Sequence, residues 1–102
     1  MLIVFTTFSK IEEADGLAEK LVEAKLAACV QILPPMTSVY VWEGKVQKES
    51  EHLLLIKTLP EKFDEVEKFI TQHHSYDVPE IAAVDAANVS PAYRKWLGDS
   101  LN

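Results

Sequence analysis

The strand-like run at residues 2–7 constrains the fold more than any other stretch of the chain. It reads Leu-Ile-Val-Phe-Thr-Thr, and apolar side chains occupy both alternating faces of the run. Such a run is typical of a central strand that is covered on both sides. The rest of the sequence must therefore supply neighbouring strands and a layer of helices to cover them.

Two amphipathic helices are predicted to supply that layer. Ser9-Lys10-Ile11-Glu12 matches a capping box and precedes an apolar stripe at helical spacing that ends near Lys25. Thr58-Leu59-Pro60-Glu61 is a second capping-box pattern, with proline in the first turn where its missing N–H costs nothing. Val78-Pro79 breaks helical structure, because proline lacks an N–H and restricts the residue before it. A short third helix is predicted to begin at Ser90-Pro91.

The remaining apolar segments predict strands at residues 28–33, 37–42, 52–57 and 81–87. Pro34-Pro35 lies between the first two of these segments and predicts a bulge or bend there, since proline cannot donate to the hydrogen-bond ladder of a sheet. Glu43-Gly44 predicts a tight turn, from which residues 45–51 return as a mostly polar strand.

The order of these elements is β-α-β-β-α-β, followed by a C-terminal helix. The simplest packing of that order is an α+β fold, a ferredoxin-like antiparallel sheet with two helices on one face and a short C-terminal helix. At 102 residues the chain is expected to form a single domain, residues 1–102.

Charge and composition argue against several classes of partner. The formal charge is −6 at pH 7, and no Lys/Arg block is present, so nucleic acid and anionic membrane surfaces are poor candidates. No apolar run approaches the roughly 18 residues of a membrane span. No signal peptide is recognised after Met1, and the single Cys29 suits a reducing compartment, so a cytoplasmic location is expected.

The stretch from His73 to Glu80 gathers most of the side chains that could carry chemistry. His73 and His74 are candidate metal ligands, since imidazole suits copper, zinc and nickel. Neighbouring residues point about 100° apart on a helix, so the pair can chelate only where the helix unwinds. Two ligands are also too few, and His52, Cys29, Glu80 or another subunit would have to complete the site. The alternative is a helix C-terminus that simply carries histidine.

Five segments in order along the chain resemble the CutA family of divalent-cation tolerance proteins. They are residues 25–30 (Lys-Leu-Ala-Ala-Cys-Val), 38–44 (Ser-Val-Tyr-Val-Trp-Glu-Gly), 55–58 (Leu-Ile-Lys-Thr), 74–81 (His-Ser-Tyr-Asp-Val-Pro-Glu-Ile) and 93–97 (Tyr-Arg-Lys-Trp-Leu). The resemblance implies a ferredoxin-like subunit in a homotrimer similar to the PII signalling proteins, with clefts between subunits. It also implies copper or other divalent-cation tolerance, with Cu(II) or another divalent cation as the candidate ligand, and no catalysed reaction.

The resemblance also bears on the metal. Copper-binding members use a cysteine near the end of the first strand together with the His73-His74 pair, whereas this chain has Thr6-Thr7 at that position. The soft ligand is absent, so we expect weak Cu(II) or Zn(II) binding rather than tight Cu(I) binding.

A ligand cleft between subunits is expected to include Trp42, Lys57, Tyr76 and Glu80. One carboxylate, one ammonium and two aromatic rings suit a small polar ligand. Cys29 is either a further cleft residue or a small buried hydrophobe. The alternative is that Trp42 and Tyr76 only pack in an interface, while Lys57 pairs with a carboxylate.

The strand at residues 37–42 predicts that the chain needs a partner copy. Val39 and Val41 point to one face, and Tyr40 and Trp42 point to the other. A helix layer can cover only one of these apolar faces, and an exposed apolar edge would invite aggregation. These four residues, with Trp96, are the candidate trimer interface; the number three comes from the family resemblance.

Three functions therefore compete. The first is a trimeric module that binds or senses a divalent cation or a small ligand. The second is a small enzyme that uses His74 and Glu80 as an acid–base pair in an intersubunit cleft. The third is a trimeric scaffold without catalytic activity. No Ser/His/Asp arrangement, phosphate loop or His-Glu-x-x-His motif is present in the sequence, so a protein without enzymatic activity is expected.

Overall fold

One long strand organises the sheet. The computed structural model describes all of residues 1–102, and its strand β4 (Lys45–Thr58) is 14 residues long. The other strands are β1 (Leu2–Phe8), β2 (Cys29–Ile32), β3 (Met36–Trp42) and β5 (Ala82–Asp85). All pairings are antiparallel and the order is β2-β4-β1-β5, with β3 paired to the remaining half of β4. The central position of β1 is the one that its two apolar faces predicted.

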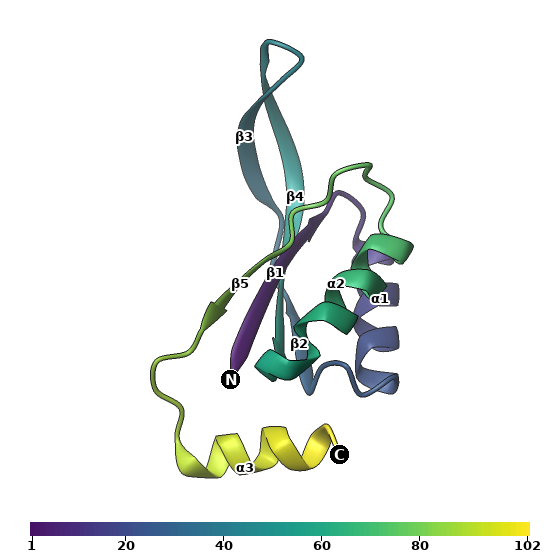
Figure 1. Ribbon diagram of the computed structural model, residues 1–102. Coiled ribbons are helices and arrows are strands. Elements are labelled where there is room, and N and C mark those ends of the chain that lie inside the picture. The colour runs from purple at the N-terminus through teal and green to yellow at the C-terminus, as the bar shows by residue number, and fades with distance from the viewer.

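The helical elements of the chain are α1 (Ile11–Glu23), the 3-10 turn η1 (Pro60–Lys62), α2 (Phe63–His73) and α3 (Pro91–Ser100). Two of the helical elements, α1 and α2, form a layer on one side of the sheet (Figure 1). Helices α1 and α2 lie side by side on the sheet, whereas α3 lies beyond the end of the sheet that is remote from the β3–β4 turn (Figure 1). The predicted α+β architecture is confirmed; β5 is shorter than the predicted strand at residues 81–87.

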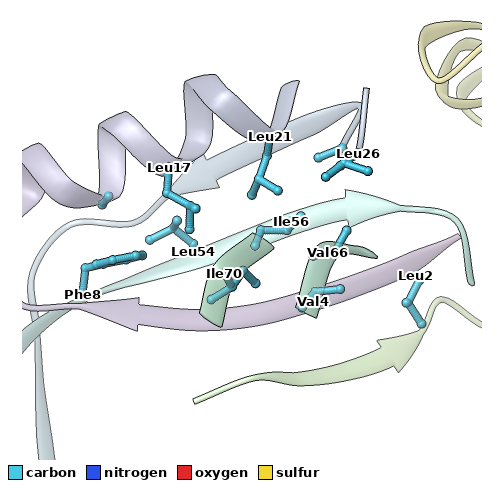
Figure 2. Packing of buried hydrophobic residues seen from close by; sticks show 12 residues of the cluster. Leu2, Val4, Phe8, Leu17, Leu21, Leu26, Leu54, Ile56, Val66 and Ile70 are labelled. Carbon is cyan, nitrogen blue, oxygen red and sulfur yellow. The ribbon is translucent and has the colours of Figure 1, made fainter. Parts of the chain in front are cut away.

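The core lies between the helix layer and the sheet, and the even-numbered side chains of β1 and β4 point into it (Figure 2). Its twelve buried members are Leu2, Val4, Phe8, Ala14, Leu17, Leu21, Leu26, Ala27, Leu54, Ile56, Val66 and Ile70. Fully burying a leucine, isoleucine or valine side chain stabilises a fold by roughly 1.5–3 kcal/mol, so this cluster holds the two layers together.

The two predicted capping boxes do not form at the starts of the first two helical segments. No side chain caps α1, and none caps η1 or α2, so Ser9 and Thr58 do not play the predicted role. The Thr58 hydroxyl instead donates to the buried Leu26 carbonyl at 2.7 Å, which is a tertiary contact that outweighs the local one. At α3 the predicted start is confirmed, because the helix begins at Pro91, and the Ser90 hydroxyl accepts from the Tyr93 N–H at 3.3 Å.

The two prolines between β2 and β3 form the predicted bulge. The Leu33 N–H still donates to the Leu53 carbonyl, but the next paired residues are Met36 and Glu51. Two residues, Pro34 and Pro35, therefore stand opposite the single His52, which is the definition of a β-bulge. The alternation of β3 is consequently shifted by one residue relative to β2.

The turn at the tip of the hairpin is also as predicted. Trp42 pairs with Lys45, and the two residues between them, Glu43 and Gly44, have φ of 52° and 77°. Positive φ at both central residues is the geometry that matches the twist of a two-residue hairpin. The hairpin, meaning β3 with residues 45–51 of β4, projects away from the helix layer (Figure 1).

Much apolar surface lacks a cover within the chain. On the sheet face opposite the helices, here called the uncovered face, lie the odd-numbered side chains Ile3, Phe5, Leu53, Leu55 and Val84, all of which remain partly or largely accessible. In the hairpin, Val39 is 61% exposed, Val41 65% and Trp42 55%. The helices therefore cover only one face, as expected.

Candidate functional site

A hollow of about 650 Å³ lies between the hairpin and the segment that joins α2 to β5. That segment, residues 74–81, is called the α2–β5 loop below. The hollow is lined by Thr7, Ser38, Val39, Tyr40, Trp42, Glu49, Glu51, Tyr76, Asp77, Val78 and Glu80. Its size falls within the range of about 300–1,000 Å³ that is usual for small-ligand pockets.

The proline bulge decides which hairpin side chains reach the hollow. Directly paired residues of an antiparallel sheet share a face, and Ser38 pairs with Glu49 while Tyr40 pairs with Gln47. Even-numbered side chains of β2 point to the helices, but after the one-residue shift those of β3 lie beside Glu49 and Glu51. The bulge therefore brings aromatic rings and carboxylates to one side of the hairpin.

His74 anchors the α2–β5 loop to the sheet. One of its ring nitrogens, Nε2, lies 2.7 Å from the Thr7 carbonyl oxygen, and since a carbonyl can only accept, Nε2–H is the donor. The other nitrogen, Nδ1, accepts from the Tyr76 N–H at 3.0 Å. The ring also stacks on Phe8 with centroids 4.1 Å apart. Both nitrogens are engaged, so His74 positions the loop and has no free nitrogen for a metal or for proton transfer with Glu80.

Two side-chain hydrogen bonds fasten the same loop to other elements. The Ser75 hydroxyl donates to Glu13 of α1 at 2.8 Å, and the Tyr76 hydroxyl donates to Oε2 of Glu51 in β4 at 2.9 Å. Because Glu51 belongs to the hairpin half of β4, the second bond ties the two walls of the hollow together.

The hollow is strongly acidic. Four carboxylates line it, those of Glu49, Glu51, Asp77 and Glu80, and none of the lining residues is lysine, arginine or histidine. Burial, with the Glu51 hydrogen bond and charge, raises the pKa of Tyr76, although a hydrogen bond with Ser9 acts in the opposite direction.

Tyr40 lies in the same electrostatic environment. Its pKa is raised by desolvation first, and then by a hydrogen bond with Glu49 and the charges of Glu49 and Glu51. A negative potential disfavours any further anion in the hollow and favours a cation.

The two adjacent histidines do not converge on one point. His73 is exposed at the end of α2, where Nδ1–H donates to the Phe69 carbonyl at 2.8 Å and the ring stacks on Phe69. Its Nε2 makes no hydrogen bond within the chain, so it is the one free imidazole nitrogen of the pair. No group of three His, Cys, Asp or Glu side chains is arranged to hold a metal ion. The residues of a single chain therefore do not fit a closed divalent-cation site.

The predicted cleft residues fall into two groups. Trp42, Tyr76 and Glu80 line the hollow together. Cys29 and Lys57 are cross-strand partners on the uncovered face, outside the hollow of their own chain, and both are partly exposed.

The surroundings of Lys57 differ from either sequence-based alternative. The Lys57 ammonium lies 5.5 Å from the centroid of Tyr93, which is a cation–π arrangement, and it makes no ion pair. Tyr93 also stacks on Trp96, which is exposed on α3.

Sequence reasoning missed three of the four acidic residues of the hollow. Glu49 and Glu51 alternate along one face of a strand, and Asp77 precedes Val78-Pro79. Counting two prolines against one residue at the bulge would have put Tyr40 and Trp42 on the same face of the hairpin as Glu49 and Glu51. That count needs the register of both ladders, which the pattern of residue types does not provide.

Comparisons with known proteins agree along the whole chain. The profile of the CutA1 divalent ion tolerance protein family matches residues 2–100. A divalent-cation tolerance protein CutA of Thermus thermophilus is 40% identical over 98 residues, which cover 96% of this chain and 95% of that protein. A chloroplast protein CutA of Arabidopsis thaliana is 42% identical over 99 residues, which are 97% of this chain but 54% of that protein. The chain spans about half the length of several such relatives from plants and animals.

Solved structures give the same result. The periplasmic divalent cation tolerance protein CutA of Archaeoglobus fulgidus superposes with a TM-score of 0.95 at 35% identity and full coverage of both chains. A divalent cation tolerance protein of Thermus thermophilus gives 0.91 at 41% identity, covering 95% of each chain. None of the helices here combines the length and apolar character that crossing a membrane requires.

Proposed function

The chain belongs to the CutA1 divalent ion tolerance family, and on that premise we propose that it is a homotrimeric binding protein of divalent-cation tolerance. In this proposal the three hairpins and uncovered faces pack together, and each hollow is a ligand site at a subunit boundary. The observation that carries it is the exposure of both apolar faces of the hairpin, because a contiguous exposed apolar surface marks an interaction site and another copy of the chain can cover it.

The exposed apolar residues of the hairpin are large, so burying them between copies can stabilise an assembly. Val39, Tyr40, Val41 and Trp42 lie next to each other in β3, and Val46 lies opposite them in β4. Burying one such side chain contributes roughly 1.5–3 kcal/mol, and closed symmetry lets every copy bury the same patch. No disulfide is required.

Light scattering at micromolar concentration tests the assembly. The expected mass is about three times the chain mass of 11.5 kDa. Tyr40→Ala combined with Trp42→Ala should shift the mass toward one chain. Val22→Ala, a control at an exposed valine of α1, should leave it unchanged. A single-chain mass for the parent protein would contradict the proposal.

The second part of the proposal is that a neighbouring copy completes the hollow. Lys57 and Cys29 lie on the uncovered face, where a neighbour's hairpin would sit, and Lys57 has no carboxylate partner in its own chain. A carbodiimide cross-linker should join Lys57 to Glu80 or Glu49 of another copy. Lys95 and Asp99, an ion pair 2.7 Å apart within α3, provide the positive control. Formation of the control link alone would refute this completion.

A second candidate activity is weak Cu(II) or Zn(II) binding, which the free Nε2 of His73 supports. We propose that His73 is the principal ligand, because the nitrogens of His74 are already engaged. His73→Ala should weaken binding in titration calorimetry more than His74→Ala does, and lower pH should also weaken it, since a protonated imidazole cannot ligate. Equal affinity for the parent protein and the His73→Ala variant would exclude the role.

We further propose that the protein acts by binding and not by catalysis, because His74 is held in place and lacks a free nitrogen for acid–base chemistry with Glu80. A cytoplasmic location remains a proposal based on the single Cys29. Relatives are described as chloroplastic and as periplasmic, so fractionation of cells that express the native gene is the appropriate measurement.

A further inference from the structure

The two prolines of the bulge between β2 and β3 are not equivalent. The Leu33 N–H donates to the Leu53 carbonyl, so these residues form a hydrogen-bonded pair of the antiparallel ladder, and such pairs recur at every second residue. In a ladder that continued from β2 without a bulge, the next donor would be the N–H of residue 35, opposite Glu51. Residue 34 would direct its backbone away from β4. Because proline has no N–H, only Pro35 conflicts with that ladder.

The bulge removes this conflict by advancing β3 by one residue. Met36, which has an N–H, pairs with Glu51 in place of residue 35. This arrangement is called the bulged register below. A ladder without the bulge would keep the register of β2, in which Val30 pairs with Ile56, and is called the continuous register.

The hydrophobic pattern, which usually sets the register of a strand, does not exclude the continuous register. Register is strongly specified where one face of a strand is apolar and buried and the other is polar. Apolar side chains occupy both faces of β3, and they remain exposed on both. A shift by one residue therefore exchanges one apolar face for another.

The turn does not exclude the continuous register either. In the bulged register Glu43 has φ of 52°, which is unfavourable for a residue with a side chain. The continuous register would pair Val41 with Lys45 and leave a three-residue loop. Such loops need positive φ only at their last residue, which here is Gly44. The missing N–H of Pro35 is therefore the feature that opposes the continuous register most directly.

The register decides which side chains of β3 reach the hollow. In the bulged register Ser38 and Tyr40 line it together with Glu49. Because a shift of one residue exchanges the two faces of a strand, the continuous register would bring Thr37 and Val41 to that side and turn Ser38 and Tyr40 away. The aromatic wall of the hollow thus depends on the bulge.

We propose that Pro35 is the positioning residue that selects the bulged register, and with it the face of β3 that lines the hollow. Pro34 has no such role. The inference goes beyond the proposed function, because it concerns the register within one chain and requires neither a ligand nor a trimer.

Cross-strand disulfides report the two registers. Val41→Cys with Val46→Cys joins direct partners of the bulged register. Tyr40→Cys with Val46→Cys joins direct partners of the continuous register. Each is a non-hydrogen-bonded pair in its own register, where the short distance between Cα atoms permits a disulfide. Cys29→Ser removes the native thiol from both proteins, and equilibration with glutathione measures how readily each disulfide forms.

Substitution of each proline then tests the assignment. Pro35→Val restores an N–H and should raise the ratio of the disulfide between positions 40 and 46 to that between positions 41 and 46 by about five- to tenfold, the contribution of one backbone hydrogen bond. Pro35→Ala restores the same N–H and should shift the ratio in the same direction. Pro34→Val is the matched control and should leave the ratio unchanged, because its N–H would point away from β4.

The ratio separates selection of the register from a general effect on stability. If Pro35 only stiffened the chain, its replacement would weaken both disulfides and would not favour the one between positions 40 and 46. An unchanged ratio, an equal increase for both prolines, or loss of both disulfides in the Pro35 variants would each overturn the proposal.

Discussion

The two halves of β4 have the same backbone structure but opposite surroundings. Residues 52–58 lie between β1 and β2, and Leu54 and Ile56 are completely buried against the helix layer. Residues 45–51 pair only with β3, and their single apolar residue, Val46, is 68% exposed. Glu51 is the one buried residue of this half.

The difference shows that strand pairing and core formation are separate requirements. The hairpin half pairs with β3 along one of its edges, yet no other strand lies on its second edge and no helix covers it. The stability of residues 52–58 is therefore a property of one chain, whereas burial of the hairpin would require the proposed trimer. Four experiments can break or sharpen this comparison.

The largest expected effect follows truncation in the core half. Leu54→Ala removes a completely buried side chain and should lower the free energy of unfolding by about 2–5 kcal/mol. Val46→Ala, the matched position in the hairpin half, should lower it by less than about 0.5 kcal/mol in solutions dilute enough to contain single chains. Urea denaturation measures both changes, and equal losses would show that the two halves do not differ in this way.

A smaller loss is expected at the end of the core half. Thr58→Val should cost about 1–3 kcal/mol, because it leaves the buried Leu26 carbonyl without the hydroxyl that now donates to it. Thr37→Val, at an exposed position of the hairpin, makes the same chemical change without a buried partner and should be nearly neutral. The denaturation midpoints should therefore separate at unchanged slope; coinciding midpoints would rule out a role for the Thr58 hydroxyl.

A substitution in the hairpin turn should change stability through backbone conformation and not through packing. Gly44 has φ of +77°, so Gly44→Ala should cost about 1 kcal/mol even though nothing obstructs the added methyl group. Gly98→Ala lies within α3, also in open space, and should stabilise by about 0.5–1 kcal/mol. Thermal unfolding should therefore move in opposite directions for the two changes. A shift of the same sign would show that the turn is not under this constraint.

The smallest effect concerns the bond between the loop and the hairpin half. The pKa of Tyr76 is raised above 10.0 in the folded protein, chiefly by burial and then by Glu51. The resulting stabilisation is fully present below pH 10 and is lost as pH rises through the folded pKa. Tyr76→Phe cannot ionise, so its stability should fall less steeply than that of the parent above pH 10 when urea midpoints are followed from pH 8 to pH 11. Parallel profiles would contradict the linkage.

The periodic features of the fold could be predicted because they depend on local spacing. The two apolar faces at residues 2–7, the stripes of α1 and α2, and the turn at Gly44 each occupy a single segment. The capping boxes failed where a tertiary partner competed. The Thr58 hydroxyl had a buried carbonyl to satisfy, and this contact joins residues that are distant in sequence.

The site could be predicted only in part. Trp42, Tyr76 and Glu80 line one hollow of a single chain, while the ligand cleft between subunits to which they were assigned stays a prediction. Histidine is a common metal ligand, but residue type does not reveal that both ring nitrogens of His74 form hydrogen bonds, with Thr7 and Tyr76. Such roles depend on which segments meet in space, and a sequence pattern does not specify that.

The central position of β1 has a consequence for biosynthesis. This strand is the first to be made, but its two neighbours, β4 and β5, come from residues 45–58 and 82–85. At a synthesis rate of roughly 5–20 residues per second, an apolar strand at the N-terminus waits on the order of seconds for its first partner. The nascent chain therefore exposes this apolar strand without a partner until residues 45–58 have been made.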